Sequence, residues 1–135
     1  MEGELQKRVS IVVPVYNEAA HIRTSMSCVG KICDDAAISY ELVLVDDGSK
    51  DESWQEISSM AKEDERITAV RLSRNFGKEA GIYAGLQHAS GEYTALIDAD
   101  LQQRPEIVRD MVQILDQQPE YDVVAAYQDR RSEGK

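Results

Sequence analysis

The chain has 135 residues, of which 42% are hydrophobic and 30% charged, which is enough for one domain with a buried core. Its 25 acidic side chains outnumber its 15 basic ones and give a formal net charge of −10. A charge of this sign repels nucleic-acid backbones and anionic membrane surfaces, so it excludes a general DNA- or RNA-binding protein, although a solubilising surface alone would also explain it.

The first half of the chain predicts two strand–helix units. Residues 10–15 form a continuous apolar run, as expected of a strand covered on both faces, and Asn17 is a suitable cap for the helix that follows. A second strand is predicted over residues 40–45, and Asp51 or Ser53 opens the next helix. Apolar side chains recur at helical spacing in both helices: Ile22, Met26, Val29 and Cys33, then Trp54, Ile57 and Ala61.

The second half continues this alternation. It predicts a strand over 67–72, a helix over 78–89 and a strand over 93–97. Pro105 suits the first position of a helix that Pro119 ends, and a last strand covers 122–126. Repeated strand–helix units predict an α/β fold, a Rossmann-like, mostly parallel sheet with helices on both faces, in which residues 1–135 form a single domain.

Cysteines, histidines and hydropathy add little to the functional assignment. Cys28 and Cys33 lie in a helical pattern without a second pair to complete a zinc site, so we interpret them as buried thiols in a reducing compartment. His21 and His88 are predicted on helices away from the ligand-binding edge and receive no catalytic role. No stretch approaches the roughly 20 apolar residues of a membrane span, and residues 1–8 contain no signal-peptide core.

Polar residues follow each of the first four predicted strands. Ligands of open α/β sheets bind at the carboxyl ends of the strands, near the point where the strand order reverses. These four segments should therefore meet at one edge of the sheet and form a binding site. They are Tyr16-Asn-Glu18, Asp46-Asp-Gly-Ser49, Ser73-Arg-Asn-Phe-Gly-Lys78 and Asp98-Ala-Asp100.

The turn after the first strand contains no glycine, and the chain has no phosphate-binding glycine loop. A divalent cation held by carboxylates would neutralise a phosphate ligand instead. Asp98 and Asp100 are two residues apart, so both carboxylates can face one ion, and Mg²⁺ typically takes one or two protein carboxylates. The alternative is that the two aspartates only cap a turn and a helix.

The remaining polar residues each allow two interpretations. Asp46 is predicted to accept an N–H from a nucleobase, whereas Gly48 and Ser49 form a turn with Gly48 at positive φ. Tyr16 could stack on a base or pack in the protein. Glu18 could bind a ligand hydroxyl or favour a helix N-terminus. Arg74 and Lys78 indicate an anionic ligand, because Lys78 begins a helix where the dipole disfavours a cation; ordinary solvated side chains are the alternative.

Together these segments resemble the family 2 glycosyltransferases with the GT-A fold. More narrowly, the chain resembles the polyprenyl-phosphate glycosyltransferases, the dolichol-phosphate mannose synthase-like branch. The similarity covers roughly residues 9–126 in the family's order and spacing. The matching segments are Ile11-Val-Val-Pro-Val-Tyr-Asn-Glu18, Val45-Asp-Asp-Gly-Ser49, Leu72-Ser-Arg-Asn-Phe-Gly-Lys78 and Ile97-Asp-Ala-Asp-Leu-Gln102, of which the last two are specific to this branch.

The resemblance implies the roles of the site residues. Asp98 and Asp100 would be catalytic, and together with Gln102 they would hold Mg²⁺ or Mn²⁺ on the diphosphate. Ala99 would contact the nucleotide through its backbone. The residues implied to bind the nucleotide sugar are Pro14, Val15, Tyr16, Asn17, Glu18, Asp46, Asp47, Arg74, Lys78, Asp98 and Ala99.

The resemblance also implies an activity, the inverting transfer of a sugar from a UDP- or GDP-linked donor to a polyprenyl phosphate such as undecaprenyl or dolichyl phosphate. The full-length enzyme would act at the cytoplasmic side of a membrane and could form a homo-oligomer, and the present soluble chain would be its nucleotide-binding N-terminal part. The chain departs from the family pattern at Gln103, Arg104 and Gln128, with Arg130 and Arg131 nearby.

Three alternatives remain open from the sequence. A family 2 transferase could instead use a polysaccharide or another glycan as its acceptor. A sugar nucleotidyltransferase would need a glycine-rich basic turn after the first strand, which is absent. A receiver-like signalling domain would need an isolated aspartate after the third strand, where this chain has Ser73 and Arg74.

Overall fold

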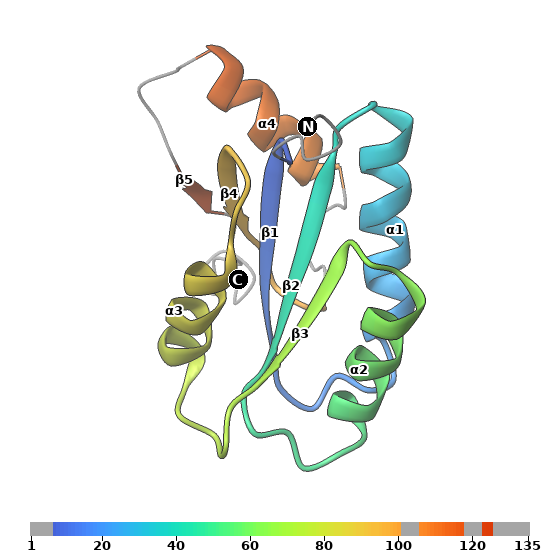
Figure 1. Ribbon diagram of the computed structural model, residues 1–135, viewed down its shortest axis with the longest axis vertical. Helices are drawn as coiled ribbons and strands as arrows, with labels where there is room; N and C mark the ends of the chain where they lie inside the picture. Colours follow the sequence, from blue (N-terminus) through green and yellow to red (C-terminus); the bar gives the residue numbers. More distant parts are fainter. Residues whose placement is uncertain (1–6, 101–105, 118–122, 126–135) are drawn as a thin grey trace, which may run out of the picture.

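The computed structural model describes residues 7–100, 106–117 and 123–125, and in this part strands and helices alternate as the sequence predicts (Figure 1). Each predicted element has its counterpart, with ends shifted by one or a few residues. The elements are β1 (Val9–Val15), α1 (Ile22–Asp35), β2 (Tyr40–Asp46), α2 (Ser53–Glu63), β3 (Ile67–Arg71), α3 (Lys78–His88), β4 (Tyr93–Leu96), α4 (Ile107–Gln117) and β5 (Val123–Ala125).

The strands form one parallel sheet of 5 strands in the order β3-β2-β1-β4-β5. This is the strand order of doubly wound dinucleotide-binding folds and confirms the predicted Rossmann-like α/β class. The chain moves outward from β1 to β3 on one side and then returns to place β4 on the other side of β1. The order therefore reverses between β1 and β4. A receiver-like domain needs the order 2-1-3-4-5, so that alternative is wrong.

Helices cover both faces of the sheet, as predicted. Helices α1, α2 and α4 lie on one face and α3 lies on the other (Figure 1). Side chains of a strand alternate between faces, so β1 contributes to two cores. Ile11 and Val13 belong to the larger cluster beneath α1, and Val12 belongs to the smaller one beneath α3. This two-sided burial explains why residues 10–15 are almost continuously apolar.

Helix α3 approaches the sheet through glycines instead of large side chains. Gly81 and Gly85 are both buried, and a Cβ atom added to Gly85 would lie only 2.4 Å from Cγ1 of Val12. The absence of a side chain at this position lets the helix axis approach the strands closely. The first residue of the helix, Lys78, thereby lies at the carboxyl edge of the sheet, where the candidate site is.

Three local predictions are wrong. Helix α1 starts at Ile22 with His21 as its N-cap, so Asn17 is not the cap; Asn17 has a φ of 55° and pairs with the turn after β2. His21 consequently lies at the carboxyl edge, not away from it. Cys28 is exposed because it faces away from the sheet, whereas Cys33 is buried as expected.

Other local predictions hold. Ser53 begins α2, and its N–H donates to Oδ1 of Asp51 at 2.9 Å, so both predicted residues take part in the helix start. Gly48 has the expected positive φ, of 70°. The predictions for Pro105, Pro119, Gln103, Arg104 and residues 126–131 lie outside the described residues.

Candidate functional site

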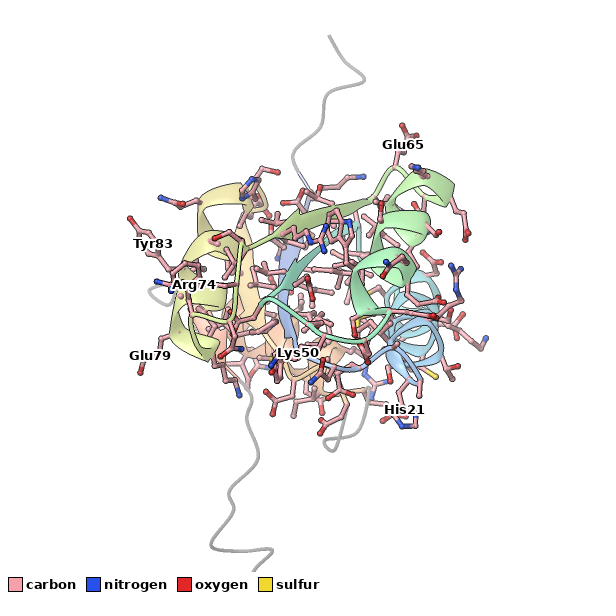
Figure 2. All side chains as sticks on the ribbon, turned by 90° about the horizontal axis from the view of Figure 1, so that it is seen from below. His21, Lys50, Glu65, Arg74, Glu79 and Tyr83 are labelled. Carbon is pink, nitrogen blue, oxygen red and sulfur yellow. The ribbon has the colours of Figure 1, made fainter. Side chains whose placement is uncertain are left out.

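A cavity of about 490 Å³ opens at the carboxyl edge of the sheet, where β1 and β4 end. Figure 2 shows this edge from below, with Arg74 and Lys50 on the loops that follow β3 and β2. The cavity therefore lies where the strand order reverses, which is the place that the α/β topology predicts for a ligand. Its described lining comprises Pro14, Val15, Tyr16, Glu18, Asp47, Asn75, Gly77, Lys78, Asp98, Ala99 and Asp100.

Most of the residues implied by the sequence meet in this cavity, but three of them do not line it: Asn17, Asp46 and Arg74. Gln102 lies outside the described residues. Two lining residues, Asn75 and Gly77, were not singled out by the sequence. No signal in the sequence separates them from Arg74, because the position of Asn75 and Gly77 depends on their hydrogen bonds to Asp47 on another loop.

Besides Asp47, three acidic residues line the cavity: Glu18 after β1, and Asp98 and Asp100 after β4. Burial raises the pKa of the Glu18 carboxyl above its usual value, and the negative charge of Asp100 raises it further. The groups are thus close enough to repel one another, which is the condition that a bound cation relieves. The chemistry of this donor set fits a hard divalent cation.

A complete protein-only metal cage is not present in the part of the chain that the structure describes, where no three acidic, histidine or cysteine side chains form a ligand group. This agrees with Mg²⁺-type binding, in which one or two carboxylates hold the ion and substrate phosphates and water complete its shell. Asp98 and Asp100 remain the predicted ligands.

Lys78 supplies positive charge to the same cavity. Its Nζ donates to Oδ1 of Asp98 at 2.7 Å. The ion pair offsets the unfavourable position of a lysine at a helix N-terminus. It also joins the start of α3 to the segment after β4, and both residues line the cavity.

Asp47 holds the loop between β3 and α3. Its carboxylate accepts the backbone N–H of Phe76 at 2.8 Å and that of Gly77 at 3.0 Å. The side-chain Nδ2 of Asn75 donates to Oδ2 of Asp47 at 3.1 Å and to its carbonyl at 3.0 Å. The side chain of Asp47 is almost fully buried, and these bonds satisfy it.

Asp46, unlike Asp47, has a carboxylate that is only partly hydrogen-bonded. Its Oδ1 accepts the N–H of Ser49 at 3.2 Å, but Oδ2 is buried and has no hydrogen-bond partner among the described residues. The nearest cation is Arg71, whose Nε lies 3.9 Å from Oδ2 and whose guanidinium also stacks on Trp54. A buried carboxylate oxygen without a hydrogen bond is unusual and is the feature that a ligand donor would satisfy.

Hydrogen bonds fix the loop after β1 against the turn after β2. The N–H of Asn17 donates to Oγ of Ser49 at 2.9 Å, and Oδ1 of Asn17 accepts the N–H of Lys50 at 2.8 Å. The N–H of Glu18 donates to Oγ of Ser53 at 2.8 Å. Asn17 thus positions its neighbours, which leaves Tyr16 at the cavity rim with 41% of its surface exposed.

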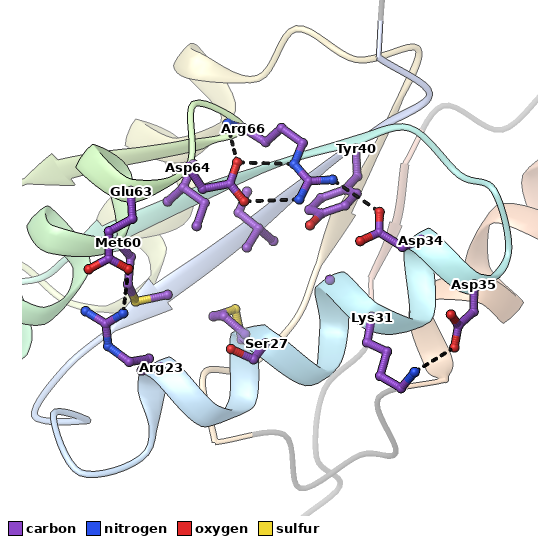
Figure 3. Close-up of a pocket in the computed structure, with 14 residues that line it drawn as sticks. Arg23, Ser27, Lys31, Asp34, Asp35, Tyr40, Met60, Glu63, Asp64 and Arg66 are labelled. Carbon is purple, nitrogen blue, oxygen red and sulfur yellow. Dashed lines mark hydrogen bonds and ion pairs between the residues drawn. The ribbon is translucent and has the colours of Figure 1, made fainter.

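A second cavity of about 510 Å³ lies at the opposite end of the sheet, between α1 and α2 (Figure 3). Its charged side chains are paired with one another. Arg66 makes hydrogen bonds to Asp64 and Asp34 and stacks on Tyr40, and Arg23 binds Glu63. This second cavity is not the candidate site, because its described charged side chains are all paired and because it lies away from the carboxyl edge of the sheet.

The family model described as "Glycosyl transferase family 2" matches residues 10–135. An undecaprenyl-phosphate 4-deoxy-4-formamido-L-arabinose transferase of Aeromonas hydrophila is 40% identical over 128 residues, which are 94% of this chain and 39% of that protein. The transferase of the same name from Edwardsiella ictaluri is 41% identical over 125 residues, 91% of this chain and 38% of that protein. The chain thus spans about two-fifths of the length of these relatives.

Solved structures agree on the fold. A mannosyltransferase from Pyrobaculum calidifontis, in complex with GDP-Man and Mn²⁺, has a TM-score of 0.67 and 27% identity over 83% of this chain and 33% of its own. TarS of S. aureus, in complex with UDP-GlcNAc, has a TM-score of 0.62 and 24% identity over 82% of this chain and 31% of its own, a likeness of fold alone. The GT-A-like α/β fold is confirmed. Within the described part of the chain, no helix has the length and apolar character needed to cross a membrane.

Proposed function

Because the chain belongs to glycosyl transferase family 2, we propose that its carboxyl-edge cavity binds a nucleotide diphosphate sugar and a divalent cation, and that the sugar is transferred to a polyprenyl phosphate. The observation that carries this proposal is the convergence of Glu18, Asp98, Asp100 and Lys78 at the point where the strand order reverses. The family excludes a sugar nucleotidyltransferase, and the first turn already lacked the glycines that such an enzyme needs.

The two sides of the cavity suggest how the donor lies. The β1 side offers Tyr16 for stacking and Glu18 for a ribose hydroxyl, and Asp46 lies behind it with its unsatisfied Oδ2. A nucleobase N–H reaching Asp46 would satisfy that oxygen, provided that Arg71 moves aside. The β4 side offers Asp98, Ala99 and Asp100 for the diphosphate and sugar. The proposed donor is UDP- or GDP-linked, the two nucleotides held by the structural neighbours.

The cation would be Mg²⁺ or Mn²⁺, held by Asp100 and Asp98 with Gln102. When bound, it would supply the positive charge that stabilises the leaving diphosphate. Lys78 neutralises part of the charge of Asp98 and would contact the same anionic group from the α3 side. Arg74 would reach the ligand only by leaving its stacked position over Phe76.

The proposed acceptor is undecaprenyl phosphate, which the names of both relatives contain. An acceptor phosphate is already ionised near neutral pH, so direct displacement with inversion requires no strong general base. The titratable groups of the described cavity lining are carboxylates, Lys78 and the phenol of Tyr16. The acceptor would place the reaction at the cytoplasmic surface of a membrane. A polysaccharide acceptor would need a base to deprotonate its hydroxyl group. The transfer experiment below distinguishes the two acceptors.

Calorimetry tests the donor site. GDP-mannose and UDP-GlcNAc are titrated into the chain with Mn²⁺, using wild type and the Asp100→Ala and Asp35→Ala variants. Asp35 is an exposed carboxylate on α1 far from the edge, so it controls for a general loss of negative charge. We expect Asp100→Ala to weaken donor binding at least tenfold and Asp35→Ala to leave it unchanged. Equal binding in all three proteins would refute the site.

Transfer is tested separately from binding. Radiolabelled donor is incubated with the chain and either undecaprenyl phosphate in detergent or an oligosaccharide, and the label is followed into the lipid or the glycan. Label in the lipid supports the proposed acceptor. Label in the oligosaccharide and not in the lipid contradicts it.

A further inference from the structure

Two adjacent aspartates follow β2 and occupy different environments. Asp46 keeps one buried oxygen unsatisfied, whereas the carboxylate of Asp47 is fully engaged by the loop between β3 and α3. That loop supplies Asn75, Gly77 and Lys78 to the cavity. We propose that Asp47 is a positioning residue, which sets the α3 side of the cavity through hydrogen bonds and does not contact the donor itself. The inference deepens the proposed function and rests on it.

The loop needs an external tether because it cannot hold itself. Gly77 is the N-cap of α3 and has no side chain that could accept hydrogen bonds from the first helical turn. Its φ of 108° is strained for other residues, and Phe76 before it is half exposed. The carboxylate of Asp47, which directly follows β2, accepts the backbone N–H groups of Phe76 and Gly77. It therefore holds the two residues that precede α3 and fixes the direction in which the helix begins.

A second contact holds the same two segments together. A Cβ atom added to Gly48 would lie 2.3 Å from the carbonyl carbon of Arg74 and 2.3 Å from the backbone nitrogen of Asn75. The turn after β2 thus packs backbone against backbone on the loop after β3. Glycine at 48 permits this approach, and Asp47 adds the hydrogen bonds.

The position of this loop affects the cavity through Lys78. This residue follows Gly77 directly, and its Nζ lies 2.7 Å from Oδ1 of Asp98, which also lines the cavity. Moving the loop would move the lysine and open that pair. Asp47 therefore affects the ion pair of Asp98 indirectly, because it holds Gly77 and so fixes the position of Lys78.

The test separates positioning from ligand contact with a matched pair of variants, Asp47→Asn and Asp46→Asn. The first readout is amide hydrogen exchange by NMR in the chain without ligand. We expect Asp47→Asn to accelerate exchange at least tenfold at Phe76 or at Gly77, because its one amide oxygen can accept only one of the two N–H groups and its NH₂ cannot accept, while the exchange of Val29 in α1 stays unchanged. Asp46→Asn should leave all three amides as in wild type.

The second readout is calorimetric affinity for GDP-mannose and UDP-GlcNAc with Mn²⁺. Asp47→Asn should bind the donor about tenfold more weakly and in parallel with its exchange rates. Weaker donor binding with unchanged exchange at Phe76 and Gly77 would mean direct contact and overturn the proposal. A uniform acceleration across the whole chain would mean a purely global structural role and overturn it too.

A second variant, Asn75→Ala, and the exchange rates of wild type distinguish the remaining outcomes. If Asp47→Asn does not fold, Asn75→Ala removes two of the bonds to Asp47 while leaving its carboxylate, and should accelerate exchange at Gly77; unchanged exchange there would count against positioning. If wild type binds neither donor, the proposed function fails, while the exchange experiment still decides whether Asp47 holds the loop.

Discussion

Lys78 and Asp98 form an ion pair of 2.7 Å between the first residue of α3 and the residue that closely follows β4. The pair brings together two segments that are neighbours in space only because the strand order reverses. The lysine side chain remains 56% exposed and the aspartate 19%, so the pair contributes little to folding, about 1 kcal/mol or less. Its main effect is electrostatic, since it places a cation beside the carboxylates of Glu18, Asp98 and Asp100 in the cavity lining.

Replacing Lys78 with methionine should therefore affect binding more than stability. We expect Lys78→Met to bind a nucleotide diphosphate sugar at least tenfold more weakly at a fixed Mn²⁺ concentration, because uncompensated negative charge repels the diphosphate. The melting temperature should change little. Calorimetry and thermal unfolding measure the two effects.

Lys50→Met is the matched control for this experiment. Lys50 is another exposed lysine at the same edge but is not part of the described cavity lining (Figure 2). The Lys50→Met variant should bind the donor with the same affinity as wild type. A similar loss in both variants would show that only the overall charge of the edge matters, and would contradict a specific role for Lys78.

The close approach of α3 to the sheet predicts opposite effects for two glycines. Alanine in place of a helical glycine ordinarily stabilises by up to about 1 kcal/mol. At Gly85 the new Cβ would lie 2.4 Å from Cγ1 of Val12, an overpacking that costs about 1–3 kcal/mol, so Gly85→Ala should be destabilising. At Gly81 the nearest atom would be Cβ of Pro14 at an ordinary 3.5 Å, so Gly81→Ala should be neutral or stabilising.

Urea unfolding of the two variants beside wild type measures both effects. The two variants carry the same substitution in the same helix and differ only in the space that is available for the new Cβ atom. Equal free energies of unfolding would show that α3 can shift away from Val12 without cost.

The fold could be predicted from the sequence because its signals are local. The continuous apolar run at 10–15 indicates a two-sided strand, and the β1 side chains do divide between two cores. The site was predictable to the level of the edge, since the topology of parallel sheets determines where the polar ends of strands meet. The residues Tyr16, Glu18, Asp98 and Asp100 lie in the cavity for that reason.

What the sequence could not provide are contacts between loops. Asn17 looked like a helix cap, but its hydrogen bond to Lys50 depends on how the turn after β2 lies beside it. Asp46 and Asp47 are the same residue type at adjacent positions, and only the approach of the β3–α3 loop distinguishes them. The prediction for Cys28 is wrong because the buried stripe of α1 runs through Met26, Val29 and Cys33, and a residue next to Val29 in sequence lies about 100° around the helix from it.

The two cysteines should differ strongly in reactivity. Burial raises the pKa of the Cys33 thiol to about 12, so at pH 8 it carries almost no thiolate, and its side chain is inaccessible. Cys28 is exposed on the outer face of α1. Titration with a chromogenic disulfide should label Cys28 rapidly and Cys33 only after denaturation. Cys28→Ser should abolish the fast phase, and a fast phase that survives in this variant would contradict the burial of Cys33.

The Asp64–Arg66 pair predicts a stability term that depends on pH. Arg66 donates to both carboxylate oxygens of Asp64, at 3.2 Å and 3.1 Å, and holds the pKa of that carboxyl below its usual value of 3.8. The native state therefore binds fewer protons than the unfolded chain, and the stabilisation is present above pH 3.8 and is lost as the pH falls through the lower native pKa.

Asp64→Asn should thus lower the free energy of unfolding by about 1 kcal/mol or less at pH 6, because the pair is partly exposed, and the difference from wild type should shrink towards pH 3. Asp35→Asn, which breaks the more exposed pair with Lys31, should have a smaller effect at pH 6. Urea unfolding at the two pH values measures both variants. A difference between Asp64→Asn and wild type that stays constant from pH 6 to pH 3 would show that the ionised carboxylate is not what stabilises this corner of the fold.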